Sequence, residues 1–375
     1  MGLQELTAVS RFYGSSDEYV IAGGGNTSFK DREYLYIKAS GTSLATIDES
    51  GFVKMDRSKL ALIWKKNYSP KSEERETAVL ADMMAARCSG EERKRPSVEV
   101  QLHDILPFAY VVHTHPTLVN SLTCSQRGEG TVRELFDAIW IPSINPGYTL
   151  SLAVKKALDL YRAEKNRDAR IILLQNHGAF VAADTIDEIK AVYGQILNVI
   201  DERIKRRPDL TRDDTEAPAQ VRDLGRALCK LADTAASGGT DCCFEFSRNP
   251  EILRLVQDKA AFYPVSSAYT PDHIVYAGSD PLFVEDALLI EGAWQAHIDK
   301  TGRPPRIVAV KGLGVFSLGA SEKTAHDAME LFLDSVKLAV YTESFGGPCF
   351  MERDKIDFIN NWEAEHYRSK IAAEK

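Results

Sequence analysis

Short β-branched or aromatic runs alternate with helical patterns over the first 200 residues of the chain. The runs lie at 34–38, 110–113 and 170–174, and helical periodicity marks 58–66, 73–87 and 187–204. Helices and strands bury their apolar faces only by packing against another layer. The alternation therefore predicts an α/β layer arrangement.

The length of 375 residues is too great for one ordinary domain and suits two. Residues 206–220 are polar and charged, contain two prolines and show no apolar periodicity, which is typical of an exposed linker. We therefore predict a first domain at 1–207, a linker at 208–220 and a second domain at 221–375. In the second domain we expect helices at 221–236 and 250–260, with a break at Gly238 and Gly239.

One stretch of the first domain resembles one of the second. The segment R-I-I-L-L-Q-N-H-G-A-F-V-A-A-D-T, from Arg170, aligns without gaps on R-I-V-A-V-K-G-L-G-V-F-S-L-G-A-S, from Arg306. His177 meets Leu313, whereas a glycine and a phenylalanine coincide (Gly178 with Gly314, Phe180 with Phe316). Chance similarity of two strand-turn-strand units is the alternative to a duplication.

The charge of the chain argues against partners bound by bulk electrostatics. Lysine and arginine number 46 against 54 acidic residues, a formal net charge of −8 with both signs interspersed, so we expect neither nucleic acid nor membrane partners. No basic, apolar leader begins the sequence, and no apolar run reaches the roughly 18 residues of a membrane span. The six cysteines form no C-x-x-C pair and are interpreted as reduced thiols. A soluble cytoplasmic protein is the expectation.

Two histidines, His113 and His115, stand two residues apart in the apolar run V-V-H-T-H-P. Side chains of a strand alternate between its faces, so both imidazoles project to one side and can share an ion. Catalytic zinc usually takes three protein ligands and leaves a position for water or substrate. His177, in the turn Q-N-H-G-A that follows an apolar run, is the natural third ligand. Imidazole also binds other divalent transition metals, so the ligand type alone does not name the ion.

The alternative for each of these histidines is a packing or capping role, and an H-x-H motif alone is weak evidence for a metal. Three such residues together among only eight histidines favour the metal site. A structural role is expected for the other five histidines, which are His103, His273, His297, His326 and His366.

Glu99 follows Pro96 and Ser97, which predict a helix start with Ser97 as its cap. An acidic residue in a first turn has an ordinary explanation in the helix dipole. The functional alternative is a general base that faces the metal. His103 lies four residues further on and would share the helix face of Glu99.

Two glycine turns carry hydroxyl and amide side chains, A-G-G-G-N-T-S-F-K at 22–30 and I-K-A-S-G-T-S at 37–43. Neither matches a P-loop or a dinucleotide-binding motif. Each could form a nest of backbone N–H groups for an oxyanion such as phosphate, although isolated turns of this kind are more often structural.

Together these motifs resemble the class II aldolase and adducin family, which contains L-fuculose-phosphate and L-rhamnulose-phosphate aldolases. The elements G-G-G-N-T-S, K-A-S-G-T-S, P-S-V-E, V-V-H-T-H-P and Q-N-H-G-A-F occur in family order between about residues 20 and 200. The region from about residue 262 resembles the part that follows the aldolase domain in fused aldolase and short-chain dehydrogenase proteins. The resemblance implies a three-layer α/β/α domain with a central, mainly antiparallel sheet. A smaller α/β domain follows, a metal-free duplicate if the internal repeat is real.

The resemblance also assigns residues to the site. It makes His113, His115 and His177 zinc ligands and Glu99 the acid/base. A pocket for a substrate phosphate would be lined by Asn26, Ser40, Gly41 and Ser97.

Two positions depart from the family pattern. Val98 stands where relatives carry a second hydroxyl, which removes one phosphate donor, and Lys38 could supply a compensating charge. Relatives also take a proton donor, a tyrosine, from a neighbouring subunit. Tyr148, in N-P-G-Y-T, is the residue we assign to that role.

The implied activity is a zinc-dependent, reversible cleavage of a ketose 1-phosphate or related sugar. The products are dihydroxyacetone phosphate and a short aldehyde, formed through a metal-stabilised enediolate. The alternatives are a sugar-phosphate 4-epimerase or dehydratase of the same family, and a non-catalytic adducin-like interaction module. Retention of the three histidines with Glu99 favours an enzyme. The resemblance further implies a homo-oligomer, a tetramer in most relatives.

Overall fold

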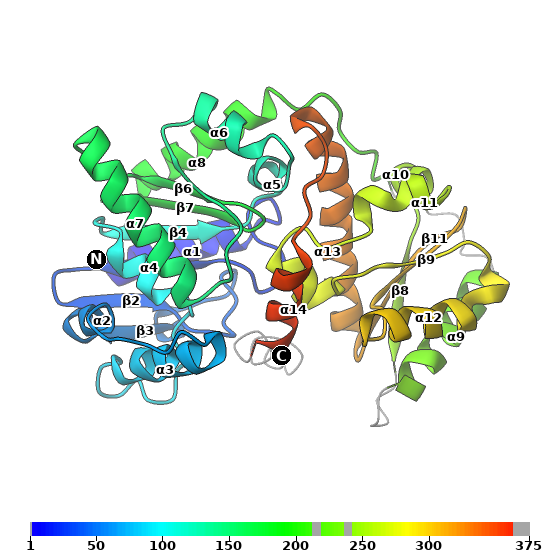
Figure 1. The fold of residues 1–375 in the computed structure, drawn as a ribbon, viewed down its shortest axis with the longest axis horizontal. Coiled ribbons are helices and arrows are strands. Elements are labelled where there is room, and N and C mark those ends of the chain that lie inside the picture. The colour runs from blue at the N-terminus through cyan, green and yellow to red at the C-terminus, as the bar shows by residue number, and fades with distance from the viewer. Residues whose placement is uncertain (1, 212–218, 236–241, 363–375) are drawn as a thin grey trace. The chain divides into compact units, whose positions relative to one another are not determined.

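A computed structural model describes residues 2–211, 219–235 and 242–362 (Figure 1). Residues 212–218 of the predicted linker, the predicted break at Gly238 and Gly239, and His366 lie outside the described residues. The chain forms two compact units, Met1–Thr123 with Arg127–Arg203, and Cys124–Gln126 with Ile204–Lys375. None of the helices in the described ranges combines the length and the apolar character that a membrane crossing requires.

The first unit contains a seven-stranded sheet in the order β3-β2-β1-β4-β7-β6-β5. Every neighbouring pair is antiparallel except β5 and β6, which run parallel. The expected central, mainly antiparallel sheet is therefore confirmed. The strands are β1 (Asn26–Lys30), β2 (Tyr34–Lys38), β3 (Phe52–Asp56), β4 (Tyr110–Thr114), β5 (Ile139–Ile141), β6 (Ile171–Leu174) and β7 (Gly178–Ala183).

Helices cover both faces of this sheet, which gives the expected three layers (Figure 1). On one face, Leu102 of α4 and Leu150 of α7 join a buried cluster with strand residues such as Val111. On the other face, the Tyr193 hydroxyl of α8 donates to the Val112 carbonyl at 3.1 Å. The helices are α1 (Gly2–Gly14), α2 (Arg57–Ile63), α3 (Ser72–Ala85), α4 (Val100–Ile105), α5 (Thr117–Thr123), α6 (Gly128–Leu135), α7 (Tyr148–Lys165) and α8 (Ile186–Asp201), with a short turn η1 (Glu49–Gly51).

The second unit contains a four-stranded sheet in the order β8-β11-β10-β9. Its strands are β8 (Cys243–Ser247), β9 (Leu282–Val284), β10 (Ile307–Val310) and β11 (Gly314–Gly319). Its helices are α9 (Ala219–Ala235), α10 (Pro250–Leu255), α11 (Lys259–Phe262), α12 (Ile290–Thr301), α13 (Glu322–Tyr341) and α14 (Arg353–Asn361), and its short turns are η2 (Tyr263–Val265), η3 (His273–Ala277), η4 (Ala287–Leu289) and η5 (Thr342–Phe345).

Two predicted helices differ from the structure. The helix expected from Pro96 begins only at Val100, and Glu99 is its N-cap residue. The helix expected at 250–260 is two helices, because the Asp258 side chain accepts a hydrogen bond from Ala261 N at 2.9 Å and so caps a new one.

The second unit repeats half of the first sheet in the same register. Ile172 pairs with Phe180 in the β6–β7 hairpin, and Val308 pairs with Phe316 at the aligned positions of β10–β11. A parallel third strand lies beside each hairpin, β5 in the first unit and β9 in the second. The turn is fixed alike, since Gln175 N donates to Ile141 O and Lys311 N to Val284 O, both at 2.9 Å.

The agreement extends to the helix whose end contacts each hairpin turn. Asn176 N donates to Thr123 O at the end of α5, and Gly312 N donates to Val256 O at the end of α10. Chance similarity of two hairpins does not explain a shared third strand and a shared helix contact. The second unit is thus a structural repeat of the β4-β7-β6-β5 part of the first.

The repeat predicts which residues the β10–β11 turn accepts. Gly312 has φ +68°, and a side chain there would meet no atom within 4 Å, so a substitution costs backbone strain alone. Asn176 occupies the aligned position at φ +57°. Gly312→Ala should lower the free energy of unfolding by about 1–2 kcal/mol, and Gly312→Asn should cost clearly less, as measured by urea denaturation.

The matched control is Gly292→Ala within helix α12, where an added Cβ also meets nothing. It should raise stability by up to about 1 kcal/mol. Equal costs for Gly312→Ala and Gly312→Asn would contradict the assignment of this turn.

Candidate metal centre

The site is built around strand β4, which pairs with β1 on one edge and β7 on the other. His113 stands opposite Asn26 of β1 and Phe180 of β7 in these ladders. Its imidazole stacks on the Phe180 ring, with centroids 4.0 Å apart and an interplanar angle of 11°. Val111, two residues earlier, packs with Leu102 of α4, so His113 projects toward the sheet face that α4 covers.

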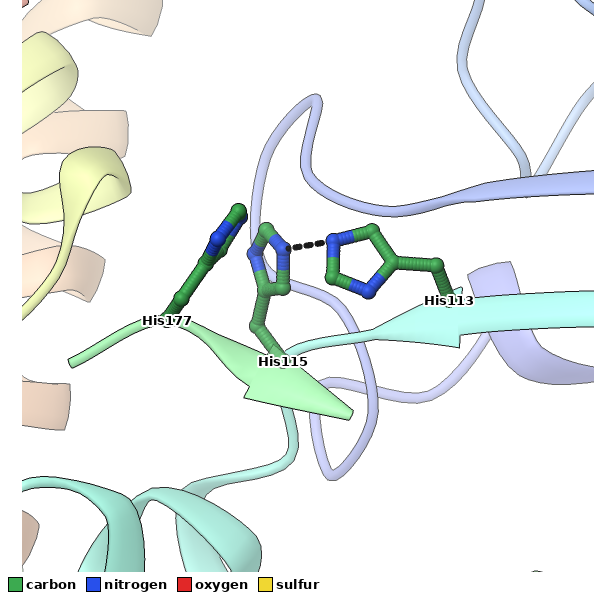
Figure 2. Close-up of side chains that lie close together, drawn as sticks. All are labelled: His113, His115 and His177. Atoms are coloured by element: carbon green, nitrogen blue, oxygen red, sulfur yellow. Dashed lines mark hydrogen bonds between the residues drawn. The ribbon is translucent and has the colours of Figure 1, made fainter. Parts of the chain in front are cut away.

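The three predicted ligands converge. Each of His113, His115 and His177 offers a ring nitrogen, and these nitrogens all lie within 4.8 Å of one another. His115 Nε2 lies 2.9 Å from His113 Nε2 (Figure 2). His113 Nδ1 donates to the Ala179 carbonyl at 3.0 Å, which leaves the lone pair of a neutral ring on Nε2, the atom that faces the cluster.

A turn brings His177 to the end of β4. Asn176 adopts the left-handed conformation, and His177 N donates to Leu174 O at 3.2 Å. Gly178 follows, and a Cβ at this position would lie 2.5 Å from Thr114 O and 2.7 Å from His115 Cδ2. Only glycine permits this approach of the two strand ends, and the approach places His177 beside His115.

Glu99 completes the cluster from the start of α4. Its Oε2 lies 3.5 Å from His113 Nε2, and its Oε1 lies 3.8 Å from His177 Nε2. The side chain is 6% exposed, and Oε1 makes no hydrogen bond to any described residue. A buried carboxylate oxygen in this state requires a nearby cation or proton, and three imidazole nitrogens beside it are a donor set suited to a divalent transition metal. The residues therefore fit a bound ion.

A series of hydrogen bonds holds the Glu99 carboxylate in place. Asn26 Nδ2 donates to Glu99 Oε2 at 2.6 Å, and Asn26 Oδ1 accepts from His103 Nε2. The other ring nitrogen of His103 lies 2.7 Å from the Ser28 hydroxyl, which therefore donates. Burial lowers the pKa of His103 well below its usual value, so the ring is neutral and donates from one nitrogen only. His103 thus orients the Asn26 amide, and the amide holds the carboxylate.

Lys30 lies beneath this chain on the same face of β1. Its Nζ donates to the His103 carbonyl at 2.6 Å. Burial lowers the pKa of Lys30 to about 7, so the group has lost much of its charge near neutral pH. Its ammonium therefore adds little positive charge below the histidine cluster.

Several residues predicted for a phosphate pocket meet at the end of β2. Ser97 N donates to Lys38 O at 3.1 Å, and Ser40 N donates to Arg95 O at 2.8 Å, so the Pro96–Ser97 segment runs beside Lys38 and Ser40. The Lys38 ammonium lies 3.5 Å from Gly23 O, in the first glycine turn. Gly41 takes φ +81° at the second turn. The Ser97 hydroxyl accepts from Glu99 N at 3.3 Å, which links this group to the acid.

Tyr148 lies elsewhere. It begins α7, is 7% exposed, and packs its ring against Trp64 and Tyr68. Its amide donates to Glu76 Oε2 at 2.9 Å, and burial raises the pKa of its hydroxyl. Within the described residues, no hydrogen bond or ring contact joins Tyr148 to the three histidines.

Three supporting residues were not identified from the sequence, namely Ser28, Lys30 and Phe180. Ser28 and Lys30 follow Asn26 at intervals of two residues and so share its face of β1. The period of two of a strand, counted from Asn26, would have indicated both. Nothing local indicates that Phe180 stacks on His113, because that contact depends on the register of β4 with β7.

The chain is similar to several known proteins. The chain is 22% identical over 423 aligned residues to the "Uncharacterized oxidoreductase YuxG" of Bacillus subtilis (strain 168), an alignment that covers 99% of the chain and 58% of that protein. The chain thus spans little more than half the length of this relative.

Among solved structures, the N-terminal class II aldolase domain of a conserved protein from Thermoplasma acidophilum is 27% identical, with a TM-score of 0.46, and the match covers 54% of this chain and 93% of that one. An L-fuculose 1-phosphate aldolase is 19% identical, with a TM-score of 0.37, and the match covers 53% of this chain and 83% of that one.

A family model decides the assignment. The model of the class II aldolase and adducin N-terminal domain matches residues 4–198. The matched range includes all seven strands of the first sheet, Glu99 and the three histidines. Since it spans more than half of the sequence, the chain belongs to the class II aldolase and adducin family.

Proposed function

We propose that the chain is a zinc-dependent aldolase that reversibly cleaves a ketose 1-phosphate or a related sugar into dihydroxyacetone phosphate and a short aldehyde. The observation that carries the proposal is the convergence of three imidazoles on a buried carboxylate, Glu99, whose Oε1 has no hydrogen-bond partner in the described residues. A protein that served only as an interaction module would have no use for this set of groups.

His113, His115 and His177 would hold the metal and leave a coordination position open to substrate. A zinc ion bound there supplies Lewis-acid polarisation of a substrate carbonyl. The ring orientations are set by the protein, as the bond from His113 Nδ1 to Ala179 O illustrates.

Glu99 gives or takes the proton at the substrate carbon where the C–C bond breaks or forms. Its Oε2 is held by Asn26 at 2.6 Å, so Oε1 is the atom available for proton transfer. His103 and Ser28 prevent the Asn26 amide from rotating, because Asn26 Oδ1 already accepts from the ring. The acid is thereby held in one orientation before substrate arrives.

Lys38, Ser40, Gly41 and Ser97 would bind the substrate phosphate. The segments that carry them lie side by side at the end of β2, and Asn26 extends the group toward Glu99. Tyr148 is proposed as the second proton donor. Because it does not contact the three histidines of its own chain, it would act in the site of a neighbouring subunit. We propose a homo-oligomer on the example of the family, and its size is measured by light scattering.

Metal removal tests the centre directly. The purified protein should contain about one equivalent of zinc or another divalent transition metal, and chelation should abolish turnover until the metal is restored. His113→Ala and His177→Ala should lose both metal and activity, measured by elemental analysis and by aldehyde release. His326→Ala, which removes an exposed histidine paired with Glu245, is the control and should retain both. Full activity in metal-free protein would refute the proposal.

Glu99→Gln separates the acid from the metal site. The amide keeps the size of the side chain and can still bond to Asn26, so metal content should stay near that of the natural protein. Turnover should fall by about 10²–10⁴-fold, the usual contribution of a general acid or base. The exposed Glu129→Gln change should have no effect. Unchanged turnover in Glu99→Gln would remove Glu99 from the mechanism.

A screen of ketose 1-phosphates identifies the reaction, because only an aldolase releases a free aldehyde, whereas a 4-epimerase returns a ketose phosphate. Lys38→Met should raise KM for a phosphorylated ketose by about 10–100-fold, the value of a charged hydrogen bond. KM for the same sugar without phosphate should barely change. An equal effect on both sugars would show that Lys38 does not bind the phosphate.

A further inference from the structure

The second unit contains a cavity of about 360 Å³ formed by its own residues alone. Its walls come from the end of α9, the start of β8, the end of η3, the last turn of α12, and the ends of β10 and β11 that lie away from the turn at Gly312. The charged and ionisable side chains in these walls are Asp233, Cys242, Asp280, His297, Arg303 and Arg306.

Two arginines in the wall have no acidic partner among the described residues. Arg306 Nη1 donates to the carbonyls of Val275 and Tyr276 at 2.7 and 3.1 Å. Arg303 Nη2 donates to the Asn360 carbonyl and the Asn361 side-chain oxygen at 2.9 and 3.2 Å. Every one of these acceptors is uncharged, so neither guanidinium group contacts a counter-charge within the described part of the chain.

The acids in the wall are already engaged. Asp280 pairs with Arg353 at 3.0 Å, and Asp233 accepts from Cys242 N at 3.1 Å. Burial lowers the pKa of His297, so this ring is neutral near pH 7 and adds no charge. Asp233 bonds here to a neutral amide and keeps its own charge, so the two guanidinium groups outweigh this one acid and leave the cavity a net positive field.

The first unit shows an acidic partner that Arg306 lacks. Ala182 N donates to Arg170 O and Leu318 N to Arg306 O, at 2.9 and 2.8 Å, which makes Arg306 the structural equivalent of Arg170. Arg170 forms an ion pair at 3.2 Å with Glu188, the third residue after the cap of α8.

At the aligned place in the second unit stands Thr324, the third residue after Ser321, the cap of α13. The second unit thus has the arginine but a hydroxyl in place of the carboxylate. Arg306 lacks the acid that Arg170 contacts at the aligned position.

A structural role explains only part of Arg306. Its bonds to Val275 O and Tyr276 O cap the last turn of η3, and they occupy Nη1 alone. Nε and Nη2 donate to no described residue. Burial and the nearby Arg303 charge lower the pKa of the Arg306 guanidinium. A negatively charged ligand would stabilise the charged form of this group.

We propose that this cavity binds a small molecule through a carboxylate or phosphate group that contacts Arg303 and Arg306. The planar guanidinium suits either group, since it donates two parallel hydrogen bonds. The volume is at the lower end of the roughly 300–1,000 Å³ of ligand pockets, which corresponds to a short acid or phosphate ester.

Calorimetric titration of the full chain with inorganic phosphate and with lactate tests the proposal. The His113→Ala/His177→Ala/Lys38→Met triple variant serves as the background, because it removes the proposed metal ligands and the charge of the proposed phosphate pocket and makes the result independent of the proposed aldolase activity. At least one probe should bind with one site per chain. The tighter probe identifies the preferred group. No detectable binding of either would overturn the proposal.

Three substitutions locate the binding. Thr324→Glu restores the acid that Arg170 has in the first unit and keeps a favourable capping sequence, so the fold should persist while the dissociation constant rises about tenfold or more. Arg303→Gln and Arg306→Met should weaken binding by a similar factor. Lys259→Met, which removes an exposed charge outside the cavity, should leave binding unchanged. Equal affinity in all four variants would place the anion elsewhere and overturn the proposal.

Discussion

The pairing of β4 with a strand on each edge is the constraint on which the first unit depends. Both ladders are antiparallel, so Asn26, His113 and Phe180 stand side by side on one face of the sheet. A slip of one residue in either ladder would turn these side chains to opposite faces. The imidazole of His113, the amide that holds Glu99 and the ring that stacks on His113 are all placed by these two registers.

A site residue could be predicted from the sequence where its position is set within one strand, and could not where it depends on the pairing of strands distant in sequence. The spacing of His113 and His115 predicts a shared face within one strand, whereas the prediction of Glu99 as the acid beside them rested on the resemblance to the family. The chain from Ser28 through His103 to Asn26 was not predictable from local pattern, because it requires the register of β1 with β4 and a helix that begins at Val100 rather than at Pro96.

The internal repeat shows which features a register preserves. Gly178 and Gly314 both lie where a Cβ would be 2.5 or 2.7 Å from a carbonyl oxygen of the neighbouring strand end, so neither position tolerates a side chain. The ligands are under no such constraint. Phe246 stands across from Phe316 as His113 does from Phe180, and Leu313 replaces His177. Two of the three ligand positions are thus apolar in the second sheet, and Arg248 stands where His115 does, while the backbone geometry of the turn is the same.

The charge pattern of the two copies also differs at their opposite ends. In the first unit the sheet end remote from the metal centre is neutralised, since Arg170 pairs with Glu188, and the exposed chemistry is concentrated at the turn around Glu99. In the second unit the turn holds no ionisable ligand trio, and the arginine at the remote end has lost its acid. Arg306 is exposed and in part solvated, whereas Oε1 of Glu99 is buried and has no hydrogen-bond partner among the described residues. Each unit thus has a charged group without a direct counter-charge, among the described residues, at one end of the same four-stranded arrangement. In the first unit this group is Glu99, at the turn end. In the second unit it is Arg306, at the opposite end, where Thr324 stands in place of an acid.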